Sequence, residues 1–202
     1  MYSQNNEEEI ILKHLGHYPT GRFLDIGAFD GITLSNTYRL YESAWNGVLV
    51  DPSPIAFVKL METYSDALGE PETDIRLVNA AVVPGPSKLM VLHDASGDPL
   101  STMNGKTLHL WPRTNFYPIT INTVNIIDFL DFVGYDFDMI SMDADGMNLE
   151  LFLSLPLDRL NKLKMIVVEH EGYVVRMTEY LGAGWTLIHT NPENAIYIRN
   201  ES

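Results

Sequence analysis

Cysteine is absent from the 202-residue sequence, and basic residues are scarce. Without cysteine, neither disulfide bonds nor thiolate zinc sites can form. Lys and Arg number 13 against 27 Asp and Glu, so the formal net charge is −14. Such an acidic chain repels phosphate backbones and anionic lipids. We therefore expect no nucleic-acid partner and no membrane attachment through a basic patch.

Long apolar runs are also missing. No stretch approaches the roughly 18 consecutive apolar residues of a membrane-spanning helix, so we expect no membrane insertion. Residues 1–9 are polar and acidic, unlike a secretory signal, which favours a cytoplasmic protein. Hydrophobic residues make up 46% of the chain, enough for the core of one α/β domain. We expect an N-terminal helical segment over residues 1–20 and the main domain over residues 21–202.

The most informative pattern lies in residues 23–31, which read FLDIGAFDG. An apolar run of this kind is typical of a buried parallel strand. Gly27 and Gly31 would let the following turn approach a ligand closely, and the next helix would point free N–H groups at that ligand. A second apolar run ends at Asp51, close to the spacing expected for an acid that binds a ribose. The pattern predicts a nucleotide-binding turn.

The details of this turn argue against a dinucleotide. The dinucleotide fingerprint needs a glycine where this chain has Phe29, and Asp25 would repel a pyrophosphate. S-adenosylmethionine carries a ribose, a cationic sulfonium and an ammonium group but no phosphate, and it suits Asp25 and Asp51 better. A nicotinamide-dependent oxidoreductase is the less favoured alternative.

Strand and helix patterns alternate along the chain. Helical patterns occupy residues 7–15, 35–41, 55–64, 124–132, 149–155 and 173–181. Strand patterns occupy residues 23–26, 47–51, 75–83, 119–123, 138–142, 165–169, 185–190 and 195–199. This alternation predicts a Rossmann-like α/β fold, with a mostly parallel sheet and helices on both faces. The short turn at residues 191–194 predicts a C-terminal antiparallel hairpin strand.

Polar residues follow the predicted strands where each strand ends. They are Asp25, Asp51, residues 79–81, residues 143–146 and residues 169–171. Ligands of parallel α/β sheets bind beyond the carboxyl ends of the strands, so we expect these groups to meet at one site. Residues 94–118 show no periodicity, and a segment of this length inside a compact domain is usually functional or mobile.

Taken in order, these motifs resemble those of the FkbM-type methyltransferases. The resemblance runs from residue 21 to the C-terminus. It rests on residues 23–31, 35–37, 45–52, 79–82, 143–146 and 168–170. It implies a class I, S-adenosylmethionine-dependent O-methyltransferase that acts on a hydroxyl of a sugar, a glycan or a related natural product.

The resemblance also implies which residues hold the cofactor. In this interpretation Asp51 binds the ribose, the glycine turn faces the methionine part, and the third strand end lies near the adenine. The implied residues are Asp25, Gly27, Ala28, Gly31, Asn36, Asp51, Asn79 and Ala80. Two positions depart from the family pattern, because Asp51 and Asp145 stand where Glu is common.

A general base near the acceptor hydroxyl would add to the effect of positioning. His170 is the first candidate, because a neutral imidazole accepts a proton near pH 7. Asp143 and Asp145 are the next candidates, although Asp145 before Gly146 would equally serve as a helix cap. Together with Glu169 these groups could instead hold a magnesium, manganese or iron ion, but we favour a site without metal.

The sequence therefore predicts a methyltransferase whose partner is a small-molecule or glycan acceptor. We expect the acceptor to contact residues 94–118, where Trp111, Phe116 and Tyr117 could stack on a sugar or fill the core. A second hypothesis is a non-catalytic protein that binds the cofactor as a scaffold. The oligomeric state is not indicated by the sequence.

Overall fold

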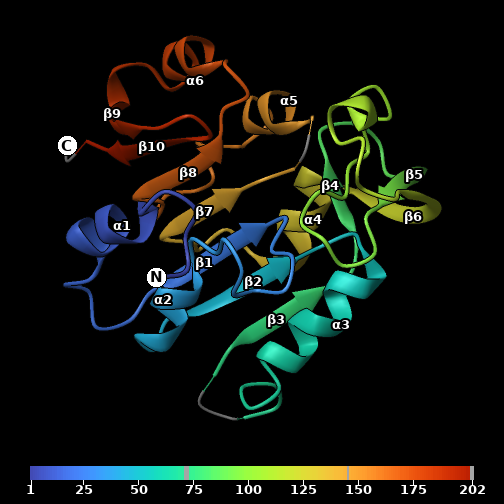
Figure 1. The fold of residues 1–202 in the computed structure, drawn as a ribbon. Helices are drawn as coiled ribbons and strands as arrows, with labels where there is room; N and C mark the ends of the chain where they lie inside the picture. The colour runs from blue at the N-terminus through green and yellow to red at the C-terminus, as the bar shows by residue number, and fades with distance from the viewer. Residues whose placement is uncertain (71–72, 145, 201–202) are drawn as a thin grey trace.

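A seven-stranded sheet forms the centre of the protein (Figure 1). The computed structural model describes residues 1–70, 73–144 and 146–200. The strand order of the sheet is β3-β2-β1-β7-β8-β10-β9. These strands are β1 (Arg22–Ile26), β2 (Asn46–Val50), β3 (Ile75–Val78), β7 (Met139–Met142), β8 (Met165–Glu169), β9 (Trp185–Thr190) and β10 (Asn194–Arg199). Within the sheet, β2 and β3 follow β1 on one side, and the chain then returns to place β7 on the other side of β1. The strand order thus reverses between β1 and β7.

Most neighbouring strands of this sheet are parallel. Phe23 of β1 lies opposite Gly47 of β2 on one side and Met139 of β7 on the other. β10 runs antiparallel to both β8 and β9. The predicted α/β class, the mostly parallel sheet and the C-terminal antiparallel hairpin strand are therefore confirmed.

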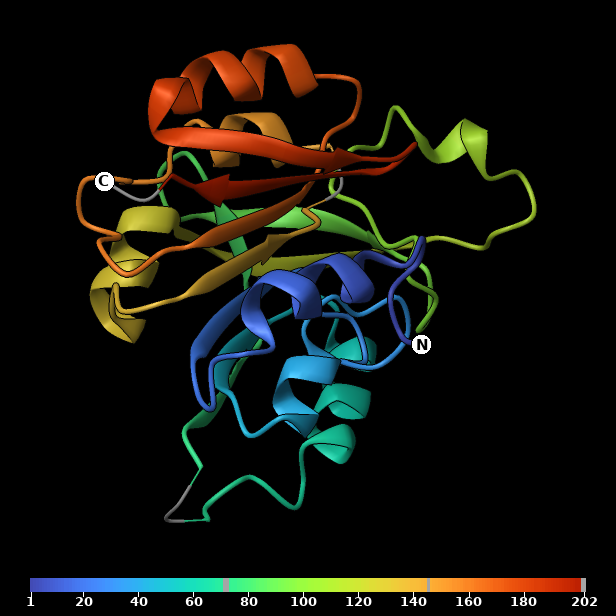
Figure 2. The same cartoon turned by 90° about the vertical axis from the view of Figure 1, so that its left-hand side faces the viewer.

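Helices cover both faces of the sheet (Figures 1 and 2). One face carries α1 (Glu7–Leu15), α2 (Tyr38–Glu42) and α3 (Pro54–Thr63), and the other carries α4 (Ile126–Val133), α5 (Asn148–Phe152) and α6 (Val174–Leu181). Successive side chains of a strand point to opposite faces of the sheet. Phe23 packs in the core under α1–α3, and Leu24 packs in the core under α4–α6. Burial on both faces explains why the strands are almost continuously apolar.

The predicted strand over residues 75–83 is in fact two strands in two sheets. β3 ends at Val78, and β4 (Ala81–Val83) joins a separate three-stranded sheet with the order β4-β6-β5. The other members are β5 (Leu89–Asp94) and β6 (Tyr117–Asn125). At the break, the Asn79 side chain donates a hydrogen bond to the backbone oxygen of Asp51. A continuous apolar run does not reveal where the chain changes sheet, so the sequence missed this division.

The first helix after the glycine turn starts later than predicted. Residues 35–41 were expected to be helical, but α2 begins at Tyr38. The Ser35 hydroxyl accepts hydrogen bonds from the backbone N–H groups of Thr37 and Tyr38, so residues 35–37 form a turn instead. This turn keeps residues 35 and 36 near the end of β1. No helix in the described part of the chain has the length and apolar character needed to cross a bilayer.

The N-terminal segment is fastened to the turn between β9 and β10. Glu7, at the start of α1, is fully buried and accepts hydrogen bonds from the side chains of Asn191 and Asn194 at 2.7 and 2.8 Å. It also accepts one from the backbone N–H of Asn5 at 2.7 Å. Burial opposes ionisation of Glu7, but these hydrogen bonds together hold its pKa below the ordinary value. Residues 1–9 therefore lie beside the carboxyl ends of the strands.

Candidate cofactor site

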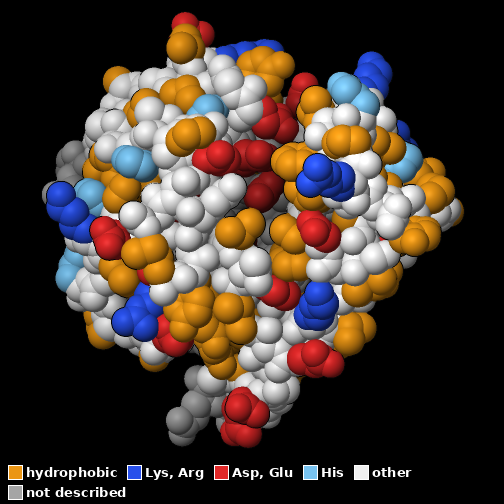
Figure 3. Space-filling view, viewed as in Figure 1, with side chains coloured by type: hydrophobic (Ala, Val, Ile, Leu, Met, Phe, Trp, Pro, Cys, Tyr) orange, Lys and Arg blue, Asp and Glu red, His pale blue; other side chains and the backbone are white. Residues whose placement is uncertain are grey.

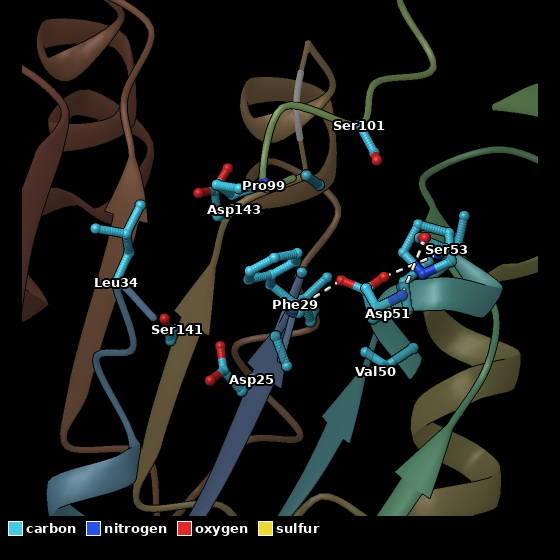
Figure 4. A pocket seen from close by; sticks show the side chains of 18 of the residues that line it. Asp25, Phe29, Leu34, Val50, Asp51, Ser53, Pro99, Ser101, Ser141 and Asp143 are labelled. Carbon is cyan, nitrogen blue, oxygen red and sulfur yellow. Dashed lines mark hydrogen bonds between the residues drawn. The ribbon is translucent and has the colours of Figure 1, made fainter. Parts of the chain in front are cut away.

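A cavity opens beyond the carboxyl ends of β1, β2 and β7, at the point where the strand order reverses (Figure 4). It encloses about 960 Å³ between atoms, part of it open to solvent. Its polar lining comes mainly from Asp25, Asn36, Asp51, Ser141 and Asp143. Six of the residues expected at the cofactor line it, namely Asp25, Gly27, Ala28, Asn36, Asp51 and Ala80. Gly31 and Asn79 do not line it.

Asp51 follows β2 and is almost completely buried. Its Oδ2 accepts a hydrogen bond from the backbone N–H of Phe29, and its Oδ1 accepts one from that of Ser53, both at 2.8 Å. Burial raises the pKa of Asp51 to about 7, against the lowering effect of these two bonds, and the charges of Asp25 and Asp143 raise it further. Each oxygen keeps a lone pair, so the carboxylate can still accept ligand hydroxyls.

Asp25 lies near the carboxyl end of β1 and is buried as well. Its carboxylate accepts a hydrogen bond of 2.6 Å from the hydroxyl of Thr37. Burial raises the pKa of Asp25 to about 6, partly offset by the Thr37 and Ser141 hydroxyls and reinforced by the nearby Asp143. Thr37 was not expected at the site. Its position in the Ser-Asn-Thr turn of residues 35–37 gave no chemical signal of this contact.

The two glycines of the turn have different roles. Gly27 has a φ of +82°, and a Cβ there would lie 1.8 Å from the backbone oxygen of Asp143. The absence of a side chain at Gly27 therefore lets the turn after β1 pack closely against the turn after β7 at the cavity. Gly31 has a φ of +80°, and a Cβ there would meet Tyr64 and Leu60 of the core at 2.6 and 2.7 Å. Its lack of a side chain serves the packing of α3 against the turn.

Asn36 has an unused acceptor. Its Nδ2 lies 3.4 Å from the Ser141 hydroxyl, whereas its buried Oδ1 has no hydrogen-bond partner within the described parts of the protein. Buried polar atoms are normally paired, so an unpaired oxygen on a cavity wall indicates a place for a ligand donor. Asn79, by contrast, supports the site from outside through its bond to the backbone of Asp51.

Asp143 is the one catalytic candidate that the structure places on the cavity wall. Its backbone N–H donates to the carbonyl of Ile26 at 2.8 Å, which extends the pairing of β1 and β7 by one residue. The loop that follows is held by buried Asn148, which accepts from the N–H of Ala144 and donates to Glu169, both at 2.7 Å. Asp145 lies outside the described residues.

His170 follows β8 and does not line the cavity. Its Nδ1 accepts a hydrogen bond from the N–H of Gly172 at 2.9 Å, and its Nε2 lies 3.0 Å from the carbonyl of Asn191. This pattern corresponds to a neutral imidazole protonated at Nε2. The ring joins the end of β8 to the β9–β10 turn, and a part in catalysis stays a prediction.

The metal alternative is not supported by the arrangement of the described side chains. Over residues 1–70, 73–144 and 146–200, no three or more His, Cys, Asp or Glu side chains are grouped so that they could hold a metal ion. Asp145 is not among them, so the preference for a site without metal stays a prediction.

Residues 95–103 cross the cavity and are called the strap here. Asp98, Pro99, Ser101 and Met103 of the strap line the same cavity as Asp25 and Asp143, and Pro99 lies beside Asp143 in Figure 4. The sequence gave one signal of this role, the loss of periodicity after residue 94. The strap lies against the cavity that holds the cofactor candidates, and contact of the acceptor with residues 94–118 stays a prediction. Trp111 and Tyr117 are exposed and do not line this cavity.

The cavity is acidic, as Figure 3 shows by the red side chains gathered in a hollow of this face. Its described lining residues include Asp25, Asp51, Asp98 and Asp143 but no Lys or Arg. Asp25 and Asp51 are buried, and burial of a carboxylate is costly, so a ligand with a sulfonium and an ammonium group would offset their charge. The unpaired oxygen of Asn36 can accept from the same ammonium. The residues present therefore fit S-adenosylmethionine.

Solved structures of methyltransferases share this fold at low sequence identity. FkbM from Methylobacillus flagellatus KT aligns with a TM-score of 0.54 and 14% identity over 91% of this chain but only 45% of its own. A candidate caffeoyl-CoA O-methyltransferase from Staphylococcus aureus aligns with a TM-score of 0.54 and 11% identity over 98% of this chain and 84% of its own.

A third structure contains the cofactor. Sp1610 of Streptococcus pneumoniae, described as a candidate tRNA (m1A22) methyltransferase, was solved in complex with S-adenosyl-L-methionine. It aligns with a TM-score of 0.50 and 9% identity, over 98% of this chain and 74% of its own. No curated protein shows a significant match to this sequence.

The family model of the methyltransferase FkbM domain matches residues 25–193, which is most of the chain. This match confirms the resemblance found in the motifs and identifies the cofactor as S-adenosylmethionine. The chain belongs to the FkbM family of S-adenosylmethionine-dependent methyltransferases.

Proposed function

We propose that the protein is an O-methyltransferase that acts on a hydroxyl of a sugar, a glycan or a related natural product. The observation that carries this proposal is the position of Asp143 on the wall of the cofactor cavity. A carboxylate at this place can accept the proton that a hydroxyl loses as it is methylated. The family assignment favours methyl transfer over hydride transfer.

Each residue of the cavity has a part in this proposal. Asp51 accepts the ribose hydroxyls, while Asp25 and the free oxygen of Asn36 hold the ammonium group. When bound, S-adenosylmethionine supplies an electrophilic methyl group on a sulfonium. Asp143 orients the acceptor hydroxyl and takes its proton. Positioning of donor and acceptor provides most of the rate.

The other candidates for the base keep a place in the proposal. The unprotonated Nδ1 of His170 would have to give up its hydrogen bond from the N–H of Gly172 before it could accept a proton from a substrate. Asp143 lines the cavity and His170 does not, so we place Asp143 first, ahead of His170 and Asp145.

We propose a neutral acceptor that is not a nucleic acid, although one structural neighbour is described as a tRNA methyltransferase. The support is the net charge of −14 and the acidic lining of the cavity, both of which oppose a phosphate backbone. A cytoplasmic location and a helical N-terminal segment followed by a methyltransferase domain from residue 21 also stay proposals.

Transfer of a labelled methyl group to defined acceptors tests this function. The purified protein is incubated with methyl-labelled S-adenosylmethionine and, separately, with simple glycosides, amino-bearing sugars and tRNA. We expect label on a glycoside hydroxyl, and an alkali-stable ether as the product. Label on an amine or on tRNA, with none on hydroxyls, would overturn the proposal.

Two variants then separate the candidates for the base. Asp143→Asn should lower kcat by about 10²–10⁴-fold while cofactor binding persists. His170→Gln should have a smaller effect, and Asp158→Asn, at an exposed position, should have none. Equal activity of the Asp143→Asn enzyme and the unaltered protein would remove Asp143 from the mechanism.

A further inference from the structure

The strap is fixed firmly at the end that joins β5. Asp94 is almost completely buried and accepts a hydrogen bond of 2.5 Å from the hydroxyl of Ser53. Ser53 also caps α3 and donates its N–H to Asp51. The second oxygen of Asp94 accepts from the N–H of Ser96, and Ser101 approaches the first at 3.4 Å. This anchor holds the base of the strap beside the candidate ribose acid.

The middle of the strap has a single side-chain attachment among the described residues. Lys59, on α3, donates a hydrogen bond of 2.8 Å from its Nζ to the carbonyl of Gly97. The bond lies at the turn of the strap, where Ser96 and Gly97 both have positive φ values of 57° and 86°. Asp98 and Pro99, the strap residues that line the cavity, come directly after this turn.

The same ammonium group lies 5.4 Å from the centre of the Phe29 ring. Phe29 has a left-handed φ of 51°, which is uncommon for a bulky residue and needs support from its surroundings. Its N–H is the donor to Asp51. In Figure 4 its ring lies between Asp51 and Asp143, below Pro99 of the strap. Lys59 therefore contacts both sides of the cavity opening, the strap and the turn beneath it.

We propose that Lys59 is a positioning residue that holds the strap against the Phe29 turn and thereby slows the release of the cofactor. The inference rests on the proposal that this cavity holds S-adenosylmethionine. Lys59 itself does not line the cavity, and it acts through Gly97 and Phe29. The charged donor makes the attachment stronger than a neutral hydrogen bond would be.

Lys59 is exposed, so its replacement leaves the core intact. Lys59→Met keeps a side chain of similar length and removes the donor and the cation. We expect the rate of S-adenosylhomocysteine release, measured by surface plasmon resonance, to rise about three- to tenfold with little change in the association rate. Lys59→Arg retains a cation that can reach a carbonyl and an aromatic ring, so it should restore most of the slow release.

Hydrogen exchange gives a second measurement that a general loss of stability would not reproduce. Amides within the strap, such as those of Ala95, Ser96, Asp98 and Leu100, donate hydrogen bonds inside it. Lys59→Met should speed exchange at these amides and leave β1, β2 and β7 unchanged. Lys13→Met removes an exposed Lys from α1 and should affect neither measurement.

The outcomes distinguish this inference from the proposed site. Unchanged release and unchanged strap exchange in Lys59→Met, in a protein that binds the cofactor, would overturn the role of Lys59 alone. If the Asp51→Ala protein also binds the cofactor with undiminished affinity, the cofactor lies elsewhere. That result would remove the basis of the proposed site and of the role of Lys59.

Discussion

The backbone N–H of Phe29 donates a hydrogen bond of 2.8 Å to the carboxylate of Asp51. This bond joins the turn after β1 to the end of β2, so the two motifs that identify the cofactor also hold each other in place. A change at Asp51 therefore acts on ligand contacts and on the shape of the turn together. Phe29 donates this bond from a left-handed conformation, with a φ of 51°.

Asp51→Ala should weaken S-adenosylmethionine binding strongly. The substitution removes the proposed partner of the ribose hydroxyls, and a hydrogen bond to a charged group contributes about 1.5–3 kcal/mol. We expect an affinity about 10- to 100-fold lower by isothermal titration calorimetry. Asp66→Ala, at an exposed acid, serves as the matched control and should bind normally. A normal affinity of the Asp51→Ala protein would contradict the assignment of this cavity.

The stability of the cofactor-free protein should fall as the pH rises from about 4 to about 7. Burial first, and then neighbouring charges, raise the pKa of Asp51 to about 7 and contribute to a pKa of about 6 for Asp25, both above the ordinary value of 3.8. In this range the folded state binds more protons than the unfolded state, so unfolding becomes easier with each added pH unit. Urea denaturation at several pH values measures the slope, and Asp51→Asn should flatten it.

A cationic cofactor should reverse this trend. Binding of a sulfonium and an ammonium group favours the ionised carboxylates, so affinity should increase between pH 5 and 8 and protons should be released. The gain is limited to about tenfold per pH unit for each proton released. Calorimetry in two buffers of different ionisation enthalpy counts the protons. An affinity that does not depend on pH would exclude ionisation of these acids on binding.

Gly27→Ala should be far more destabilising than Gly172→Ala. Both glycines have positive φ values, 82° and 83°, so both substitutions carry a similar backbone strain of about 1 kcal/mol. Only at Gly27 would the new Cβ strike the backbone oxygen of Asp143, whereas the space at Gly172 is open. We expect an additional loss of about 3 kcal/mol or more at Gly27, or failure to fold. Equal losses would show that the Gly27 and Asp143 turns can separate at little cost.

Glu7→Gln should release the N-terminal segment from the β9–β10 turn. The two Asn side chains donate to one oxygen of Glu7 and the N–H of Asn5 donates to the other, so a glutamine must direct its NH₂ group at one of these donor sets. We expect a loss of about 1–3 kcal/mol at pH 7. Because the pKa of Glu7 is lowered, its contribution is complete above about 4.5 and is lost as the pH falls through the lower folded value. The difference in thermal stability between the two proteins should therefore shrink as the pH falls below about 4.5. Glu9→Gln, at an exposed position in the same turn of helix, is the control.

The sequence predicted the centre of the main sheet well, because β1, β2, β7 and β8 are buried on both faces and are marked by apolar runs. It also predicted that Asp25, Asp51 and Asp143 would meet, since the carboxyl ends of parallel strands lie along one edge. It could not separate β3 from β4, because a change of sheet leaves no mark in a row of apolar residues. It also could not show that the ring nitrogens of His170 bond to Gly172 and to the β9–β10 turn, since the second contact depends on a carbonyl 21 residues away.

The roles of single residues were harder to predict than their location. Gly31 fits the motif of a ligand turn, yet it makes room for Tyr64 and Leu60. Asp94, Lys59 and the strap carry no motif at all, and only the loss of periodicity after residue 94 pointed to them. Contacts between a loop and a helix that is distant in the sequence depend on the three-dimensional path of the chain, which local patterns do not contain.

The three-stranded sheet limits which part of the loop between β5 and β6 can vary during evolution. β5 and β6 pair from Leu89 opposite Asn122 to Asp94 opposite Tyr117, and an added bridge joins His93 to Thr102. The ends of the loop between them are thus held at a fixed separation, whatever residues lie at 104–116. Insertions or replacements there would leave the strap and the cofactor acids in place. We expect a lineage to acquire new methyl acceptors by exchanging this loop, while the means of holding the methyl donor stays unaltered.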